Sequence, residues 1–384
     1  MRIRHRSISI LLLVVLAGPG GHCLCAQQDI VLTNVYEAAI DLPRIYFLLK
    51  RDPTGPPLMP GAQFQMNYAF LDTGASGILL SRETRQLMHV AVHPQARFAD
   101  VGVGGVEYFD VSELLCLGIR GYGRQNPQNP QLYLPIGRGR FQIRRNTAEM
   151  LTGPLDIIGA PAMAGRVVVL DSGATNNLGY FAADIRRPDD PTIPETHLQV
   201  PLRLRNFVHS SDPRNTPPLP TTAPNPVIDN IVVRYRDRVS RSTWLLDTGG
   251  TVSLISTRQA ARLGLVKNDG TPLVSPDFHL PLGGIGKMTM APGYEIGDMM
   301  VPTASGRNLI FRRARLGVHD IAFFDEEKKK MSVLDGVFGS NFLCASAKMQ
   351  GMLPSNVSET MLDKVVIDIN SAVMGLRFRR ELKR

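Results

Sequence analysis

One short stretch occurs twice in this chain. Residues 70–81 read as two apolar residues, Asp-Thr-Gly, a small residue and an apolar run ending in Ser, and residues 245–256 repeat this pattern 175 positions later. A single Asp-Thr-Gly means little, because Asp and Gly are common turn residues. Two copies in matching apolar frames indicate an internal duplication, and such a repeat limits the fold more than any other feature of the sequence.

The duplication extends well beyond the tripeptide. In each half a glycine pair follows, then two apolar residues and a Gly, and then an apolar run that closes on Asp. These landmarks are Gly104-Gly105, Ile157-Ile158-Gly159 and residues 167–171 in the first half, and Gly283-Gly284, Val337-Phe338-Gly339 and residues 365–368 in the second. Because they occur in one order at nearly equal spacing, the chain is expected to fold as two similar units.

Composition is that of a globular protein with many turns. The chain has 384 residues, of which 43% are hydrophobic and 20% charged, and this length suits two domains. The 35 glycines and 28 prolines separate short strand-like runs, so we predict an all-β, bilobal fold with two β-barrel-like lobes related by a pseudo-twofold axis. The formal charge of +9 is spread along the chain, which favours a solvated basic surface over nucleic-acid binding.

The N-terminus is typical of a secretory leader. Arg2, Arg4 and Arg6 precede an apolar core at residues 8–17, which is too short to anchor stably in a bilayer. We expect residues 1–26 to be a signal peptide, and the protein to be exported, either secreted or periplasmic, or tethered to the membrane if the leader is retained. No later segment has the 18 or so apolar residues of a membrane span.

The boundary between the two units is predicted in a polar, proline-containing stretch at residues 186–197. This gives an N-terminal lobe at residues 27–190 and a C-terminal lobe at residues 191–384. A more proline-rich stretch at 212–226 lies between two strand-like runs, and we interpret it as a loop within the second unit.

A few local elements and the cysteines complete the expected organisation. Helical turns are predicted at residues 82–89 and 355–364, and a hairpin at 101–111. Cys116 and Cys344 remain after leader removal, one in each half, and are either free and buried or bonded to each other. Two cysteines do not make a disulfide scaffold.

Each copy of the repeat would place a carboxylate at the end of an apolar strand, before a turn that Gly permits. Two carboxylates held about 3 Å apart cannot both ionise easily and therefore share one proton. The ionised member can take a proton from water, and the protonated member can hydrogen-bond a substrate carbonyl. Asp72 and Asp247 are therefore the candidate catalytic pair. This chemistry needs no metal or cofactor, and the eight His residues show no metal-ligand spacing.

This constellation resembles the aspartic peptidases, both the pepsin-like and the retropepsin-like branches. The resemblance covers nearly all of the chain after the leader. It implies that Asp72 and Asp247 form the catalytic dyad of an endopeptidase, and that its substrate is a polypeptide. The same resemblance implies three kinds of support. Thr73, Gly74, Thr248 and Gly249 would hold the two loops together, Ile158, Gly159, Phe338 and Gly339 would lie behind them, and Gly104, Gly105, Gly283 and Gly284 would form the tips of substrate-covering hairpins.

The chain also departs from the pepsin-like pattern. Ala75 and Gly250 stand where pepsin-like enzymes usually carry Ser or Thr, and the Ala is similar to retropepsins. The Tyr of a pepsin-like flap has no good counterpart, since Tyr108 is a poor candidate. We therefore interpret the chain as two retropepsin-like units fused in tandem, which would act as a monomer because each half supplies one Asp.

These residues also admit other interpretations. The two Asp residues could simply cap turns, or the chain could be a catalytically silent relative that binds peptides or proteins in its cleft. Asp171 begins an Asp-Ser-Gly, but it occupies the place of Asp368 in the repeat and is assigned a structural role. The arginine-rich stretch at residues 118–153 is interpreted as a solvated surface rather than as a binding site for acidic substrate residues.

Overall fold

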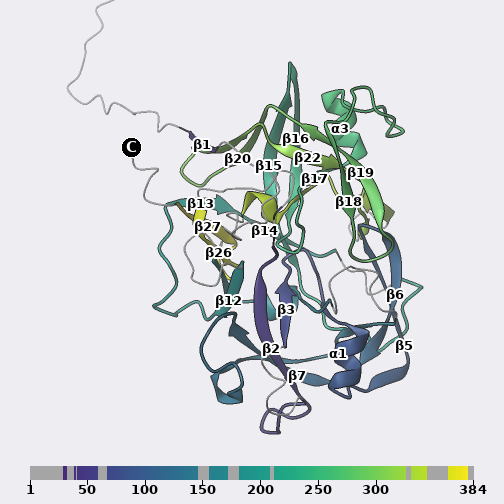
Figure 1. The fold of residues 1–384 in the computed structure, drawn as a ribbon, viewed down its shortest axis with the longest axis vertical. Helices are drawn as coiled ribbons and strands as arrows, with labels where there is room; N and C mark the ends of the chain where they lie inside the picture. The colour runs from purple at the N-terminus through teal and green to yellow at the C-terminus, as the bar shows by residue number, and fades with distance from the viewer. Residues whose placement is uncertain are drawn as a thin grey trace, which may run out of the picture.

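The computed structural model describes residues 29–32, 39, 41–58, 67–145, 155–171, 181–207, 212–325, 330–343 and 362–378. Its elements are almost all strands, arranged as two lobes that are stacked along the long axis of the molecule (Figure 1). The N-terminal elements form one lobe and most of the C-terminal elements form the other. The all-β, two-lobed prediction is confirmed.

The N-terminal lobe is built on a 14-stranded sheet, counted over the described residues. Eleven of its strands come from the first half of the chain: β2 (Arg44–Lys50), β3 (Tyr68–Leu71), β4 (Ile78–Leu80), β5 (Val92–Gly102), β6 (Gly105–Ser112), β7 (Leu115–Gly121), β8 (Leu134–Gly139), β9 (Gln142–Arg144), β10 (Ile157–Ile158), β11 (Val167–Asp171) and β12 (Ala182–Arg186). The other three are β13 (Leu198–Pro201), β26 (Leu362–Asp368) and β27 (Val373–Phe378).

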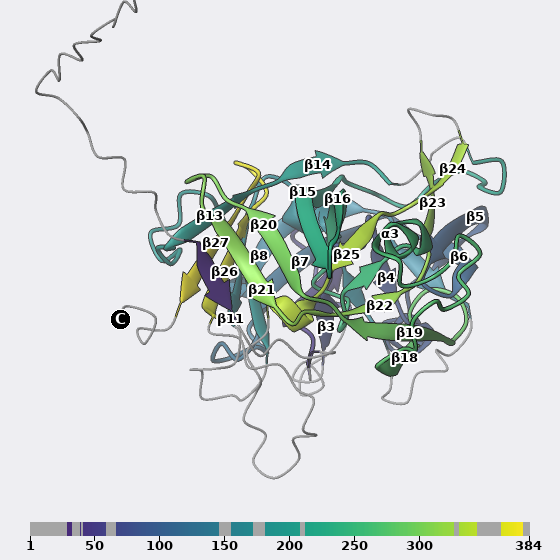
Figure 2. The ribbon, with the colours of Figure 1, turned by 90° about the horizontal axis from the view of Figure 1, so that it is seen from above.

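The C-terminal lobe is built on an 11-stranded sheet within the described part of the chain. Its strands are β1 (Ile30–Leu32), β14 (Arg203–Arg205), β15 (Asn225–Tyr235), β16 (Arg238–Leu246), β17 (Leu254–Ile255), β18 (Phe278–Leu282), β19 (Thr289–Glu295), β20 (Asp298–Pro302), β21 (Asn308–Arg312), β22 (Arg315–Val318) and β25 (Gly336–Phe338). A separate hairpin of β23 (Ala322–Asp325) and β24 (Lys330–Val333) lies beside β5 (Figure 2).

Each half of the chain contributes strands to the sheet of the other half. β26 pairs with β11 and β27 pairs with β13, so the C-terminal end of the chain completes the N-terminal sheet. In return, β1 pairs in parallel with β21 of the C-terminal lobe. The hydrogen-bonded sheets thus cross the boundary drawn between residues 190 and 191, and that boundary stays a prediction.

Short helices occupy equivalent places in the two lobes. α1 (Arg82–Leu87) follows β4, and α3 (Thr257–Leu263) follows β17. Ser81 and Ser256, which end the two copies of the repeat, accept a hydrogen bond from the third residue of each helix, and this caps its free N–H groups. α2 (Ala160–Met163) and the 3₁₀ helix η3 (Ser340–Phe342) follow the two apolar-apolar-Gly sequences. A further 3₁₀ turn, η2 (Pro130–Leu132), lies in the loop before β8.

The proline-rich loop between β14 and β15 crosses from the C-terminal lobe to the hairpin of β5 and β6 in the N-terminal lobe. Thr216 forms a two-way backbone bridge with Arg97 of β5, and the Asn215 Oδ1 accepts from the Ala99 amide at 2.8 Å. Further along, the Ala223 amide donates to the carbonyl of Ser76. The loop therefore adds to the open edge of β5, which its sequence alone does not indicate.

Several sequence predictions lie outside the described residues. The leader and Cys344 lie there, as does most of the helix predicted at 355–364; residues 362–364 begin β26 instead. Cys116 is described as a free thiol. None of the described helices is long and apolar enough to cross a membrane.

Candidate active site

The first Asp-Thr-Gly lies in a loop that connects two strands on either side of a third. β3 delivers Asp72, and the chain then returns along β4. β10 lies between them, parallel to β3 and antiparallel to β4, with Ile158 opposite Leu71. The Asp72 amide donates to the Ile158 carbonyl at 3.0 Å. The apolar-apolar-Gly sequence therefore anchors the backbone of Asp72 directly.

The second copy repeats this arrangement. β16 delivers Asp247, β17 returns, and β25 lies between them with Phe338 opposite Leu246. The Asp247 amide donates to the Phe338 carbonyl, again at 3.0 Å. Two segments far apart in the sequence therefore place their Asp residues in the same local geometry, as the matched spacing predicted.

Glycine is required behind each Asp loop because there is no room for a side chain. A Cβ on Gly159 would lie 2.0 Å from the Gly77 carbonyl oxygen, and one on Gly339 would lie 2.3 Å from the Val252 carbonyl oxygen. The next amides, of Ala160 and Ser340, donate to the loop carbonyls of Ala75 and Gly250 at 2.8 and 2.7 Å.

The two loops interlock through their threonines, both fully buried. The Thr73 hydroxyl donates to the Leu246 carbonyl at 2.6 Å and accepts from the Thr248 amide at 3.0 Å. The Thr248 hydroxyl donates to the Leu71 carbonyl at 2.7 Å and accepts from the Thr73 amide at 3.1 Å. Each hydroxyl thus bridges to the opposite lobe, so the interlock sets the relative position of the two Asp residues.

The carboxyl groups of Asp72 and Asp247 meet where the loops cross and are hydrogen-bonded to each other. Each also lies against the glycine of the other loop. A Cβ on Gly249 would be 2.3 Å from the Asp72 Cγ, and one on Gly74 would be 2.7 Å from the Asp247 Cγ. The Gly of each tripeptide is therefore needed for the close approach of the opposite carboxyl group.

Burial raises the pKa of both carboxyl groups, and the negative charge of Asp72 contributes to the rise at Asp247. The backbone hydrogen bonds of the two carboxyl groups differ. Asp72 Oδ1 accepts from the Gly74 and Ala75 amides at 2.7 and 3.0 Å, whereas Asp247 Oδ1 accepts from the Gly250 amide at 2.9 Å. Amide donors favour the charged form. The two carboxyl groups therefore titrate as a coupled pair rather than as independent residues.

Other polar residues that support the loops were not found from the sequence. The Asn225 Nδ2 donates to the Thr73 carbonyl at 2.8 Å, and its Oδ1 accepts from the Ser76 hydroxyl at 2.5 Å. In the other loop, the Ser340 hydroxyl donates to the Thr248 carbonyl at 2.8 Å. Asn225 comes from the C-terminal half and supports the N-terminal loop. Its contact depends on how the lobes assemble, and no local pattern reveals it.

The glycine pairs lie at the ends of two hairpins, β5–β6 and β18–β19. Gly105 begins β6 with φ of 99°, which suits Gly, and Gly283 and Gly284 follow β18. The two tips touch: the Gly104 amide donates to the Ile285 carbonyl at 2.8 Å, and the Lys287 amide donates to the Gly104 carbonyl at 3.1 Å.

Both hairpins close over a cavity of about 250 Å³ that contains the two Asp residues. Gly283 and Gly284 line this cavity. On the other hairpin it is Gly102 and Val103 that line it, whereas Gly104 faces the opposite tip. The role of these glycines toward a substrate stays a prediction.

One arginine of the arginine-rich stretch does not lie on the surface. Arg144 is 3% exposed and forms a bidentate ion pair with Glu107 of β6. It also donates to the Gly284 carbonyl at 3.0 Å, while Glu107 accepts from the Gly286 amide at 3.1 Å. This pair therefore links the two hairpins, and the expectation of a solvated arginine surface is wrong for Arg144.

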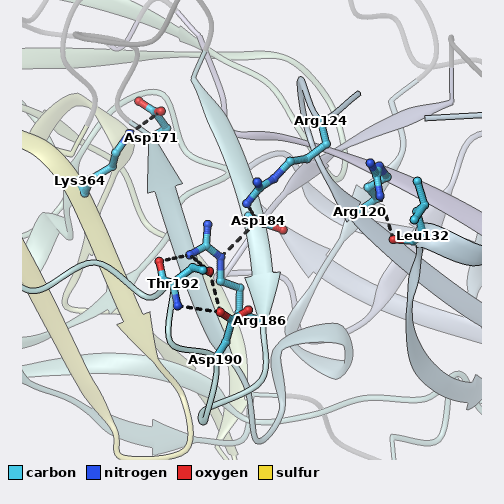
Figure 3. Close-up of polar contacts among 9 residues, drawn as sticks. All are labelled: Arg120, Arg124, Leu132, Asp171, Asp184, Arg186, Asp190, Thr192 and Lys364. Atoms are coloured by element: carbon cyan, nitrogen blue, oxygen red, sulfur yellow. Dashed lines mark hydrogen bonds and ion pairs between the residues drawn. The ribbon is translucent and has the colours of Figure 1, made fainter. Parts of the chain in front are cut away.

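Asp171 and the surface arginines have structural partners (Figure 3). Asp171 forms an ion pair with Lys364, which lies opposite it on β26. Arg124 forms an ion pair with Asp184, and Arg120 donates to the Leu132 carbonyl. Asp171 is not among the residues that line the cavity of Asp72 and Asp247.

Two further expectations concern Tyr108 and metal binding. Tyr108 is 46% exposed on β6 and is not among the residues that line the cavity. Within the described part of the chain, no group of three or more His, Cys, Asp or Glu side chains is arranged to hold a metal ion.

Comparison with known proteins gives a distant structural likeness and no sequence match. No family model matches the chain, and no curated protein matches it. Among solved structures, the chain is similar to basic 7S globulin from soybean, with a TM-score of 0.41 and 9% identity over 88% of this chain and 96% of that one. We draw no functional argument from a likeness at this level.

Proposed function

We propose that the protein is an aspartic endopeptidase that hydrolyses polypeptides with a water molecule activated between Asp72 and Asp247. One observation carries the proposal: two carboxyl groups, one from each lobe, are hydrogen-bonded to each other in the cavity beneath the two hairpins. A turn-capping role does not account for this geometry, since a capping Asp has no need of a second carboxyl group beside it.

The roles of the two residues follow from their environments. Asp72, with two amide donors, acts as the base that takes a proton from the water. Asp247 keeps its proton and donates it toward the substrate carbonyl, which stabilises the negative charge that develops on that oxygen. The hairpins over the cavity exclude bulk water and hold the peptide in an extended form.

We also propose where the protein acts and in which oligomeric state. The leader-like residues 1–26 support export, either secreted or periplasmic. Because a single chain supplies both Asp residues, we propose that the active form is a monomer with one site. Titration of the active protein with a tight inhibitor should then give one site per chain.

The test is hydrolysis of unfolded casein by the purified chain at pH values from 2 to 8, with and without a statine-containing peptide that mimics the tetrahedral intermediate. Hydrolysis that the statine peptide blocks is the expected result. Absence of hydrolysis at every pH by the folded chain would contradict the proposal. If the same chain still bound peptides, the alternative of a catalytically silent binder would be favoured.

A further inference from the structure

Besides the two Asp residues of the dyad, three charged side chains among the described residues line the cavity: Asp100, Asp212 and Arg214. Arg214 and Asp212 form an ion pair with each other. Asp100, in contrast, takes part in none of the ion pairs formed by the described residues. It is therefore a carboxyl group that faces the cavity and whose charge no neighbouring cation balances.

Asp100 lies on the inner face of the β5–β6 hairpin. Side chains alternate along β5, so Asp100 shares its face with the buried Phe98. Its Oδ1 accepts from the neighbouring Val101 amide at 2.8 Å, and its Oδ2 accepts from the Gln142 Nε2 at 3.2 Å. Residues on the buried face of a strand are usually apolar, so the carboxylate of Asp100 at this position needs an explanation.

The surroundings of Asp100 disfavour a charge. Glu107 lies directly opposite it on β6, and like charges at that position repel. Arg144 balances the charge of Glu107 but forms no ion pair with Asp100. Burial, and to a lesser extent Glu107, raise the pKa of Asp100. Groups that are costly to hold in the folded protein concentrate at functional sites.

The walls near Asp100 are apolar. Leu79, Phe98 and Ile157 line this side of the cavity, and all three belong to one hydrophobic cluster beneath the hairpin. The amide of Gln142, which contacts Asp100, also lies against Gly77 of the Asp72 loop, where a Cβ would be 2.7 Å from its nitrogen. Apolar walls that lead from the catalytic loop to a carboxyl group match a side chain with an aliphatic stem and a cationic end.

We propose that this part of the cavity is a subsite for a lysine or arginine side chain of the polypeptide, with Asp100 as the residue that selects it. The assignment rests on the proposed function only in taking a polypeptide as the ligand. A bound ammonium or guanidinium group would balance the charge of Asp100 with a charge-assisted hydrogen bond. The aliphatic stem would cover the apolar walls.

The first test uses hydrolysis. Peptides released from casein are sequenced, and the residues at each position relative to the cleaved bond are compared for the wild type and Asp100→Asn. We expect Lys or Arg to predominate at one fixed position. For a peptide with Lys there, kcat/KM should fall about tenfold to hundredfold in Asp100→Asn, the effect of a lost charge-assisted hydrogen bond. The counterpart with norleucine, which lacks the ammonium group, should be cleaved no more slowly by Asp100→Asn than by the wild type.

The second test uses binding and does not require activity. Fluorescein-labelled ten-residue peptides of apolar residues, with one Lys moved through each position, are compared with norleucine counterparts by anisotropy on the full chain. The Lys form should bind about tenfold more tightly at one position, and Asp100→Asn should remove this difference. If this preference is found without hydrolysis, the subsite is supported while the proposed function fails.

Two other results would contradict the subsite. Hydrolysis with apolar residues at every position, unchanged in Asp100→Asn, would overturn the subsite while the proposed function stands. Absence of hydrolysis together with equal binding of the Lys and norleucine peptides would overturn both. The control is Asp110→Asn in the same hairpin, because Asp110 pairs with Arg145 and does not line the cavity. Should Asp100→Asn fail to fold, Asp100→Ser gives the same comparison.

Discussion

Replacement of Thr73 by Val should destabilise the protein through the interlock between its lobes. Valine has nearly the same shape but lacks the hydroxyl that donates to the Leu246 carbonyl and accepts from the Thr248 amide. Two buried backbone groups would lose their partners. Each such loss costs about 1–3 kcal/mol, so the free energy of unfolding should fall by about 2–6 kcal/mol. That is a large part of the roughly 5–15 kcal/mol by which proteins of ordinary stability are folded.

The matched control is Thr73→Ser, which keeps the hydroxyl and loses only a methyl group, at a cost of about 1 kcal/mol. Both variants and the wild type are unfolded in urea, and the midpoints are compared after a check that the slopes agree. Thr248→Val should behave like Thr73→Val, because its hydroxyl makes the two equivalent bonds. If Thr73→Val unfolded within about 1 kcal/mol of Thr73→Ser, the interlock would not carry the stability assigned to it.

Three more outcomes are expected. Gly249→Ala would place a Cβ 2.3 Å from the Asp72 Cγ, so kcat should fall about 100-fold or more. Gly55→Ala, in an open loop, should leave kcat unchanged. Equal kcat values for the two variants would contradict the packing. Burial raises the pKa of Asp156 to about 6, so its stabilising contribution is complete below about pH 4 and is lost as the pH rises through 6. The unfolding free energy of the wild type should therefore fall by roughly 2–3 kcal/mol relative to Asp156→Asn between pH 4 and 7, and parallel curves would refute this. In the wild type, we expect kcat/KM to have its optimum at about pH 4–6. Ala75→Ser adds a hydroxyl beside Asp72 and should move the acidic limb of this pH profile to lower pH. An acidic limb at the same pH in both proteins would contradict this.

The parts of the site that could be predicted from the sequence are those encoded locally in both halves. The Asp-Thr-Gly copies and the apolar-apolar-Gly segments have matched spacing, and the structure brings Ile158 and Phe338 next to the two Asp loops. Strand alternation and turn residues are local signals, so the hairpin at 101–111 and the helix after residue 81 could also be predicted. Duplication turns a weak local signal into a strong one.

The parts that could not be predicted depend on contacts between distant segments. The loop at 212–224 gives no sign that it pairs with β5, because any free strand edge can accept such a partner. The pairing of β26 with β11 is likewise a choice among similar apolar strands. Arg144 was expected on the surface, and only the position of Glu107 across the assembled sheet explains its burial. Such pairings are set by the tertiary fold rather than by local propensity.

The central claim is that Asp72 and Asp247 act as one acid–base pair, and it is tested most directly by the hydrolysis of one peptide by three proteins. These are the wild type, Asp72→Asn and Asp247→Asn, compared at the pH optimum after each is shown to be folded by its melting temperature. Because the pair works as a unit, each substitution alone should abolish hydrolysis while the fold remains. Near-full activity in either folded variant would contradict the account.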